Sequence, residues 1–357
     1  MKYKIIILLI FAVLCSTQIV YGQEKEDMED NFNTISKELK KGRLSQVGTY
    51  VIEKGKEIVS DKIATNKKLL KQIILVCIMA AIFKNFSDAF FADSSSDTAF
   101  YVTYIVLISC MTGSFSYLNT IVDTAITTLN DYMKGFFSTY CLAIVSVSGV
   151  TSSTAIYELY LGIIYVISCG IKYGLLPGIK VFYLCNIVNY LSKDDKISKL
   201  CDGIEWLITG SLKVFIGAVL GIQMIQAMIL PHIDALKNGV VLKGISMIPG
   251  VGAGSQTITT AMIGSAVIIK NSVGAAGIVL ILLFLLEPIL QMGVVFLAYF
   301  STSILLQPIS DKRVIGVLEG MTRSIKLFFR LILSISILFM ISIAIIAFTT
   351  NVTYYAG

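Results

Sequence analysis

A carboxylate beside a proline interrupts a long apolar run in the second half of the chain. Glu287 and Pro288 lie at the centre of residues 272–306, where most other side chains are apolar. An ionisable group inside lipid is costly and usually faces a cavity or a charged partner, while proline frees a backbone carbonyl that can line a polar path. Two interpretations follow: a pore-lining or proton-sensing carboxylate, or a helix break at the bilayer edge where Glu287 meets water.

A glycine-rich stretch, IPGVGAGS at residues 248–255, superficially resembles a phosphate-binding loop. Such a loop needs a following Lys-Ser or Lys-Thr pair and a surrounding βαβ unit, and the sequence has neither, so we predict no nucleotide site. Small residues also let a backbone turn tightly and let helices approach closely. We therefore predict a re-entrant turn at a helix–helix contact, formed by Pro249, Gly250, Gly252 and Gly254.

Few other residues could support catalysis. The single histidine, His232, excludes a His–His metal pair and a two-histidine acid–base scheme, and its place after Pro231 at the end of an apolar run favours an interfacial or capping role. Ser211 and Lys213 are separated by one residue, so they point to different faces of a helix and cannot form a good Ser–Lys dyad. The sequence predicts no enzyme, no cofactor and no metal site.

The amino-acid composition indicates the class of protein to which the chain belongs. Of the 357 residues, 55% are hydrophobic and only 15% are charged, and the mean hydropathy is +0.80. Soluble proteins carry about 25% charged residues, so this chain is predicted to be a polytopic membrane protein. Its net charge of +6 suits basic loops and does not argue for nucleic acid. The seven cysteines do not indicate a disulfide framework, because most of them lie in apolar runs.

The first residues have the pattern of a secretory signal peptide. Lys2 and Lys4 precede an apolar core at residues 5–15, which is too short to span a bilayer. We expect residues 1–22 to be the signal peptide, with an uncleaved signal anchor as the alternative. Cleavage would place the mature N-terminus on the extracytoplasmic side.

Residues 23–68 are rich in charge and differ in character from the rest of the chain. Their apolar residues recur at spacings of three and four, which predicts amphipathic helices in an extracytoplasmic segment. The segment could be a docking surface for a partner outside the membrane, or a helical lead-in that lies on the bilayer. Amphipathicity alone does not distinguish the two.

The remaining domain, residues 69–349, is predicted to be an all-α membrane domain, because its apolar runs are continuous and lack the alternation of barrel strands. A span needs about 20 mostly apolar residues. Residues 72–91 are a weaker candidate, and residues 257–270 are a marginal, re-entrant one. We expect about six to eight crossings. The clearest spans are residues 100–118, 133–150, 206–230 and 327–349.

Two stretches with interrupted helices, residues 156–230 and 272–349, resemble each other. Each has the order broken helix, basic loop, strong span, and Pro177 and Gly178 are the candidate hinge of the first copy. Internal repeats with interrupted helices recur in membrane transport folds, although apolar sequences also match by chance. Matched positions are separated by 111 residues for Pro177 and Pro288 and by 117 for Gly203 and Gly320.

The loops in the two copies are basic. The positive-inside rule places both in the cytoplasm, which would make the repeats parallel and put the C-terminal tail, residues 350–357, outside. The basic residues are Lys193, Lys196 and Lys199 in the first copy, and Lys312, Arg313, Arg323 and Lys326 in the second.

Several short motifs resemble the stage III sporulation protein AE family. They are LLPGIKVF at residues 175–182, IPGVG at 248–252, IKNSVG at 269–274 and LQPISDKR at 306–313. The resemblance covers about residues 69–349, and its most specific part is the Leu-Gln-Pro stretch. The first 68 residues match the family only in character.

This resemblance implies a role in endospore formation. The family is encoded with other stage III sporulation proteins in one operon of the mother cell, and these proteins form, with a partner in the forespore membrane, a transenvelope channel or secretion-like complex. This chain would be a non-enzymatic, multi-pass subunit in the mother-cell membrane that surrounds the forespore. The alternative is a stand-alone secondary transporter of a small solute. The family provides no catalytic or transport residues to carry over.

Overall fold

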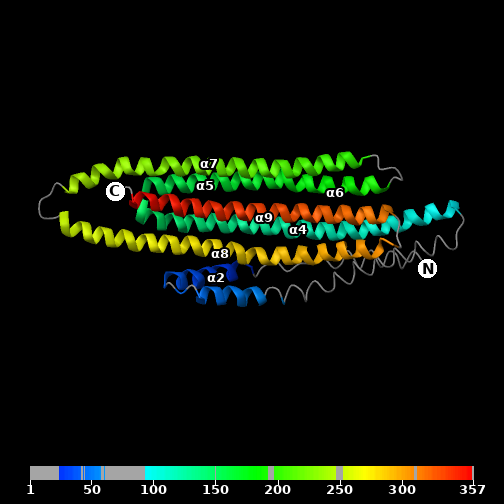
Figure 1. The fold of residues 1–357 in the computed structure, drawn as a ribbon, viewed down its shortest axis with the longest axis horizontal. Helices are drawn as coiled ribbons and strands as arrows, with labels where there is room; N and C mark the ends of the chain where they lie inside the picture. Colours follow the sequence, from blue (N-terminus) through cyan, green and yellow to red (C-terminus); the bar gives the residue numbers. More distant parts are fainter. Residues whose placement is uncertain are drawn as a thin grey trace.

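The computed structural model describes residues 24–41, 43, 45–57, 60, 93–148, 150–191, 197–246, 252–308 and 312–355, and the elements in them are helical. The prediction of an all-α fold is therefore confirmed. The predicted signal peptide and the weak span at residues 72–91 lie outside the described residues. The long helices, packed side by side in Figure 1, are α4 (Asp93–Ser148), α5 (Val150–Gly170), α6 (Leu176–Leu191), α7 (Ser198–Ser246), α8 (Gly252–Leu306) and α9 (Lys312–Tyr355).

The chain passes back and forth along the bundle. Helices α4, α7 and α9 run in one direction, and α5, α6 and α8 run in the other (Figure 1). As a result α6 and α8 end, and α7 and α9 begin, at the same end of the bundle, which we call the basic end. The two connections predicted to be cytoplasmic thus leave the bundle on the same side.

Helices α7 and α9 run parallel and in register. Three hydrogen bonds link Glu205 to Arg323, Thr209 to Arg330 and Gln223 to Ser342, and the paired residues are 118, 121 and 119 positions apart. Such a nearly constant separation requires two helices that advance together in the same direction. A parallel repeat would produce this pairing, and the repeat itself stays a prediction.

Helix α4 is longer than the sequence pattern suggested. The two predicted spans at residues 100–118 and 133–150 fall largely on this one helix of 56 residues. The segment between them, residues 119–132, contains several polar side chains but neither glycine nor proline, and polar side chains alone do not end a helix.

Helix α8 also corrects three predictions. It contains 55 residues and continues through Pro288, so the predicted break beside Glu287 is absent. Residues 257–270, predicted to be re-entrant, are part of the same helix. Gly252 and Gly254 begin it instead of forming a turn, while Pro249 and Gly250 lie outside the described residues. Membrane helices tolerate proline because packing against neighbouring helices compensates for the lost hydrogen bond.

The first predicted break is present in a milder form. A π-helical turn, Ile171–Leu175, joins α5 to α6, and the N–H of Leu176 donates to the carbonyl of Ile171, five residues back. Pro177 follows immediately as the second residue of α6. A π turn shifts the hydrogen-bond register by one residue and often marks a bend or functional position, so the interruption is a change of register within one continuous rod.

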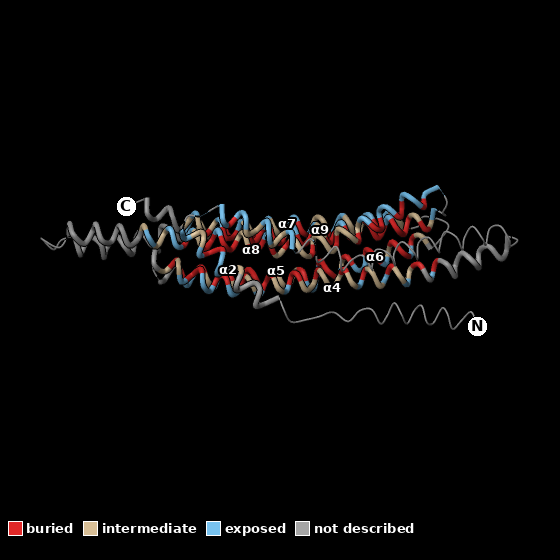
Figure 2. Tube along the Cα trace, turned by 90° about the horizontal axis from the view of Figure 1, so that it is seen from below, coloured by how far each residue is buried: buried red, intermediate tan, exposed pale blue. Residues whose placement is uncertain are grey.

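The bundle core is formed by apolar and aromatic side chains on the inner sides of the helices, which Figure 2 shows as buried. Phe115 of α4 stacks on Tyr183 of α6 with ring centroids 4.1 Å apart, and it also contacts Phe328 of α9 at 5.4 Å. At 1.5 Å per residue α4 is about 84 Å long, whereas the hydrocarbon core of a bilayer is about 30 Å thick. Much of the bundle must therefore project beyond the lipid.

The charged N-terminal segment folds as a helical hairpin. It consists of α2 (Glu24–Lys40) and a helix at residues 45–57, as the amphipathic pattern predicted, and we call these two helices the N-terminal hairpin. Its apolar side is not free for a partner, because Ile35 and Val47 are buried against Ala276, Leu280 and Leu283 of α8. Figure 1 shows the hairpin lying alongside α8.

Candidate functional site

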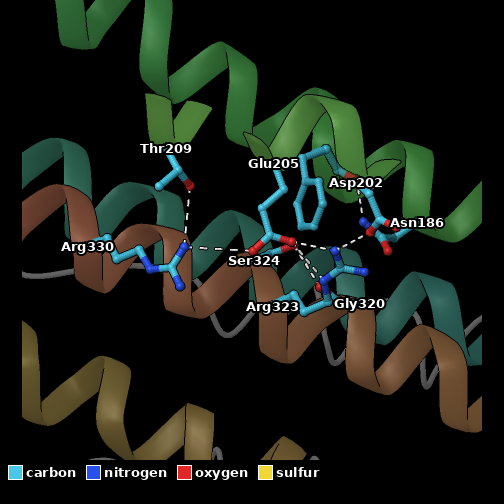
Figure 3. A network of polar contacts seen from close by, with 9 residues as sticks. Asn186, Asp202, Glu205, Thr209, Gly320, Arg323, Ser324 and Arg330 are labelled. Atoms are coloured by element: carbon cyan, nitrogen blue, oxygen red, sulfur yellow. Dashed lines mark hydrogen bonds and ion pairs between the residues drawn. The ribbon is translucent and has the colours of Figure 1, made fainter. Parts of the chain in front are cut away.

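A cluster of four charged residues joins α7 to α9 near the basic end (Figure 3). Arg323 donates from Nε to Glu205 Oε2 at 2.9 Å and from Nη2 to Asp202 Oδ1 at 2.6 Å. Arg330 lies 3.8 Å from Glu205 Oε1 and donates to Thr209 Oγ1 at 3.3 Å. The two positive and two negative charges balance, so the cluster can be partly buried without leaving an uncompensated charge.

Helix α6 closes one side of the cluster. The Arg323 guanidinium lies 5.4 Å from the ring centroid of Phe182, within the range of a cation–π interaction. Asn186, one turn further along α6, is buried and donates to the Phe182 carbonyl at 2.8 Å. Arg323 therefore contacts α6 as well as α7, and the cluster fixes the relative position of three helices.

The close approach of α6 and α9 depends on two glycines. A Cβ atom at Gly316 would lie 2.2 Å from Cε1 of Tyr190, and one at Gly320 would lie 2.8 Å from Cβ of Asn186. Gly316 and Gly320 form a G-x-x-x-G pattern, which in membrane helices lets two backbones pack closely. A larger residue at Gly320 would require the helices to move apart, and one at Gly316 would require the Tyr190 ring to move.

Helices α7 and α9 each contain a long stretch without charged side chains, and the two stretches lie at the same level of the bundle. Lys213 of α7 and Arg330 of α9 are followed by residues 214–233 and 331–349, which contain no Asp, Glu, Lys or Arg. We call these two stretches the apolar band. Because Thr209 contacts Arg330 and Gln223 contacts Ser342, the two stretches lie side by side. Each stretch is about 30 Å long, which is the thickness of the bilayer core. The charged cluster comes just before both stretches, so it lies at the edge of the apolar band.

Length and composition mark out candidate membrane-spanning stretches. Among the described residues, four stretches are long and apolar enough to cross a bilayer. One crossing needs about 20 residues, and each of the four stretches is longer than that. In α7 and α9 the apolar band is the part whose length fits the lipid. The four stretches are Ser153–Tyr190, Ser198–Ile229, Gly264–Leu306 and Lys312–Thr349.

Glu287 is half-buried near the level where the apolar band begins. Its neighbour Leu285 lines the same small void as Ile332 and Ile335, which lie near the start of the band in α9. Gln291, one turn later on α8, donates from Nε2 to Glu287 Oε1 at 3.1 Å. Pro288 is buried in the intact helix.

The predicted hinge at Pro177 and Gly178 in α6 and the carboxylate of Glu287 in α8 face different neighbours. A Cβ atom at Gly178 would lie 3.3 Å from Ile208 Cγ1, so Gly178 faces α7, while Pro177 is exposed. Glu287 lies instead on the stripe of α8 that contacts the N-terminal hairpin. It follows Ala276, Leu280 and Leu283 at spacings of three and four.

Sequence reasoning missed two features of the described residues. Arg323 was counted only as a basic loop residue, although opposite charges near the starts of two matched spans were a usable signal of pairing. Lys270 is fully buried within α8, and its Nζ donates to the carbonyl of Ala347 at 3.3 Å. A cation at this depth is expensive, so its burial marks a tightly specified contact between α8 and α9.

The part of the chain that the structure describes contains no group of three or more His, Cys, Asp or Glu residues that could hold an ion. Its five cysteines are free: Cys110, Cys141, Cys169, Cys185 and Cys201.

Comparison with protein families identifies the group to which this bundle belongs. The family model described as stage III sporulation protein AE matches residues 30–350, which includes nearly all of the described helices. The chain belongs to the stage III sporulation protein AE family. The resemblance of the motifs at residues 175–182 and 306–313 is thereby confirmed.

A curated member of the stage III sporulation protein AE family supports the same assignment. The stage III sporulation protein AE of Bacillus subtilis (strain 168) is 23% identical over 297 residues, which cover 82% of this chain and 73% of the relative. No solved structure shows a significant match to the chain. Membership implies a role in stage III of sporulation, and the family is one of sporulation membrane proteins and not of enzymes.

Proposed function

We propose that this chain is the multi-pass membrane subunit of the stage III sporulation channel, a secretion-like complex that links mother cell and forespore and is required for endospore formation. Its partners would be the other stage III proteins of the same operon and a protein of the forespore membrane. It would lie in the mother-cell membrane around the forespore, with its N-terminus on the extracytoplasmic side after signal cleavage.

The observation that carries this proposal is family membership over residues 30–350, combined with the apolar band. The band gives α7 and α9 a length that fits one bilayer. The helices extend well beyond the band at the basic end, and this projecting part offers surface on which other subunits could assemble.

A stand-alone secondary transporter is the alternative, and the void described where α4, α8 and α9 meet is too small to be its substrate site. Such transporters bind substrate near the bilayer midplane in pockets of about 300 Å³ or more. At the level of the apolar band, α4, α8 and α9 meet around a void of only about 10 Å³, lined by apolar side chains and Ser336. That volume is close to the space of a single water molecule.

Affinity purification from sporulating cells tests the proposal. The full-length chain, tagged and expressed from its own locus, is extracted in mild detergent from sporulating cells, and an untagged strain taken through the same preparation is the control. We expect the sister stage III proteins to be recovered from the tagged strain only. Recovery of the chain alone, with solute uptake by proteoliposomes that contain it, would favour the transporter.

A further inference from the structure

A stripe of polar side chains runs along the outer side of α4. Its members recur at spacings of three and four, so they lie on one face of the helix. Five of them are exposed and two are half-buried. Buried residues such as Val122 and Leu129 occupy the opposite face, which packs into the bundle. The polar stripe consists of Ser116, Thr120, Asp123, Thr127, Asp131, Lys134 and Ser138.

The polar stripe is level with the apolar band. Phe115, just before the stripe, contacts Phe328, just before the band in α9. Further along, Ala125 and Ile126 of α4 line the same void as Ile332 and Ile335 of α9. Residues 116–138 of α4 therefore lie at the same depth as the apolar band of α7 and α9, which corresponds to the bilayer core.

At this one depth the bundle has two chemically different sides. Around Gln223 the exposed side chains of α7 are apolar: Ile222, Met224, Ile225 and Met228 are 52%, 60%, 61% and 73% exposed. On α4 the exposed residues include Asp131 and Lys134, which form an ion pair at 2.9 Å.

The surroundings of the polar stripe are also polar. The N-terminal hairpin packs on α8 at Ala276 and Leu280, next to Tyr132 of α4, and its exposed side carries charges such as Lys40 and Glu53. Glu287 continues the stripe of α8 that the hairpin covers. On the other side of α4 lies α5, whose Ser168 accepts a hydrogen bond from Asn130 of α4. Lys172, in the π-helical turn one helical turn after Ser168, is exposed.

Lipid cannot cover this side of the bundle. Each charged residue placed at the centre of a bilayer costs about 2.5–3.5 kcal/mol, and Asp123, Asp131 and Lys134 lie there together with the charged hairpin. Where α4, α8 and α9 meet, the void that they enclose is only about 10 Å³. Because the polar stripe lies on the outer face of α4, water that solvates its side chains lies outside the single-chain core.

We propose that the polar stripe of α4 lines a water-filled space at bilayer depth in the assembled complex, while the exposed side of α7 faces lipid. This inference rests on the proposed channel function and specifies which face of the chain borders the conduit. The N-terminal hairpin and Glu287 lie beside the same space.

Thiol labelling compares two matched positions. In a variant whose native cysteines are replaced and which still supports sporulation, Thr127→Cys places a thiol in the middle of the polar stripe. Met224→Cys places one on the apolar side of α7, also within the apolar band and at an exposed position. Native membranes from sporulating cells are treated with a charged, membrane-impermeant methanethiosulfonate. Labelling with N-ethylmaleimide, which enters lipid, confirms that both thiols are present and reduced.

The Thr127→Cys variant should react at least about 10-fold faster than the Met224→Cys variant, because hydrocarbon excludes the reagent and disfavours the thiolate. Equal rates would overturn the assignment. If both variants are slow, lipid or protein covers the stripe, and if both are fast, α7 does not face lipid. If the sister proteins still co-purify with a slowly labelled Thr127→Cys variant, the channel function stands and only the lining face is wrong.

Discussion

Gln223 of α7 donates a hydrogen bond from Nε2 to Ser342 Oγ of α9 at 2.8 Å, inside the apolar band where both side chains are buried. The Ser342 hydroxyl can in turn donate to the Leu338 carbonyl at 2.7 Å. This polar contact holds the two helices in parallel register at a depth where water does not compete.

Removing one partner of that contact should destabilise the bundle. Ser342→Ala leaves the buried Gln223 amide without its partner, which costs about 1–3 kcal/mol, whereas the double variant with Gln223→Leu removes both polar groups and should recover much of the loss. Thermal unfolding in detergent measures both. If the single and double variants unfold at the same temperature, the amide and hydroxyl do not interact as described.

The charged cluster at the edge of the band should contribute modestly and in a salt-dependent way. Arg323→Gln removes the hydrogen bonds to Glu205 and Asp202, and because these groups are partly exposed we expect a loss of about 1 kcal/mol that shrinks at high salt. Lys199→Gln, an exposed residue in the first turn of α7, removes the same charge and is the control. Equal shifts in Tm for the two variants would contradict a specific role for Arg323.

Helix α4 approaches α8 at a glycine. A Cβ atom at Gly277 would lie 2.4 Å from Cε2 of Phe136, whose ring is buried beside Tyr132, Phe137 and Tyr140 and cannot easily move. Gly277→Ala should therefore destabilise the protein by about 1–3 kcal/mol through overpacking.

Another glycine of the same helix provides the control for this substitution. Gly293 has open space around it, so Gly293→Ala should be neutral or slightly stabilising. Adding Phe136→Leu should partly rescue Gly277→Ala. Similar unfolding temperatures for the two alanine variants would show that α4 and α8 are not packed this closely.

Glu287 provides a functional test. If the carboxylate borders a polar path, Glu287→Gln should reduce spore yield, since the amide keeps the shape and removes the charge. Glu319→Gln, at an exposed position near the basic end of α9, should leave the yield unchanged. Wild-type yield from Glu287→Gln would exclude a role in transport.

The side of the membrane on which the basic end lies can be measured directly. Lys199→Cys and Lys312→Cys are in the first turns of α7 and α9, which begin at the same end of the bundle. When the chain is expressed in the plasma membrane of vegetative cells, both thiols should be protected from an impermeant reagent in intact cells and should react after permeabilisation. Labelling of one thiol from outside and the other from inside would rule out this helix arrangement.

The sequence was sufficient to predict the helical membrane fold and the shared side of the two basic connections, because these depend on local hydropathy and charge. It did not predict the continuity of α4 or α8. Polar residues 119–132 and Pro288 resemble boundaries in a hydropathy profile, but neighbouring helices stabilise the backbone there.

The contacts of the candidate site could not be predicted for a different reason. Arg323 meets Glu205 across 118 residues of chain, and Gly320 matters only because Asn186 lies opposite. Such pairs depend on the register between helices, which hydropathy does not specify. The G-x-x-x-G pattern at Gly316 was the local signal that could have pointed to this seam.

Residues 214–233 of α7 should cross the lipid while the basic end projects from it, and spin labels along α7 test this central claim most directly. Nitroxides at Asp202, Val214 and Met224 are compared in proteoliposomes for collision with oxygen, which concentrates in lipid, and with a water-soluble nickel complex. We predict that oxygen accessibility rises and nickel accessibility falls from Asp202 to Met224. Equally high nickel accessibility at all three positions would contradict this placement of the helix.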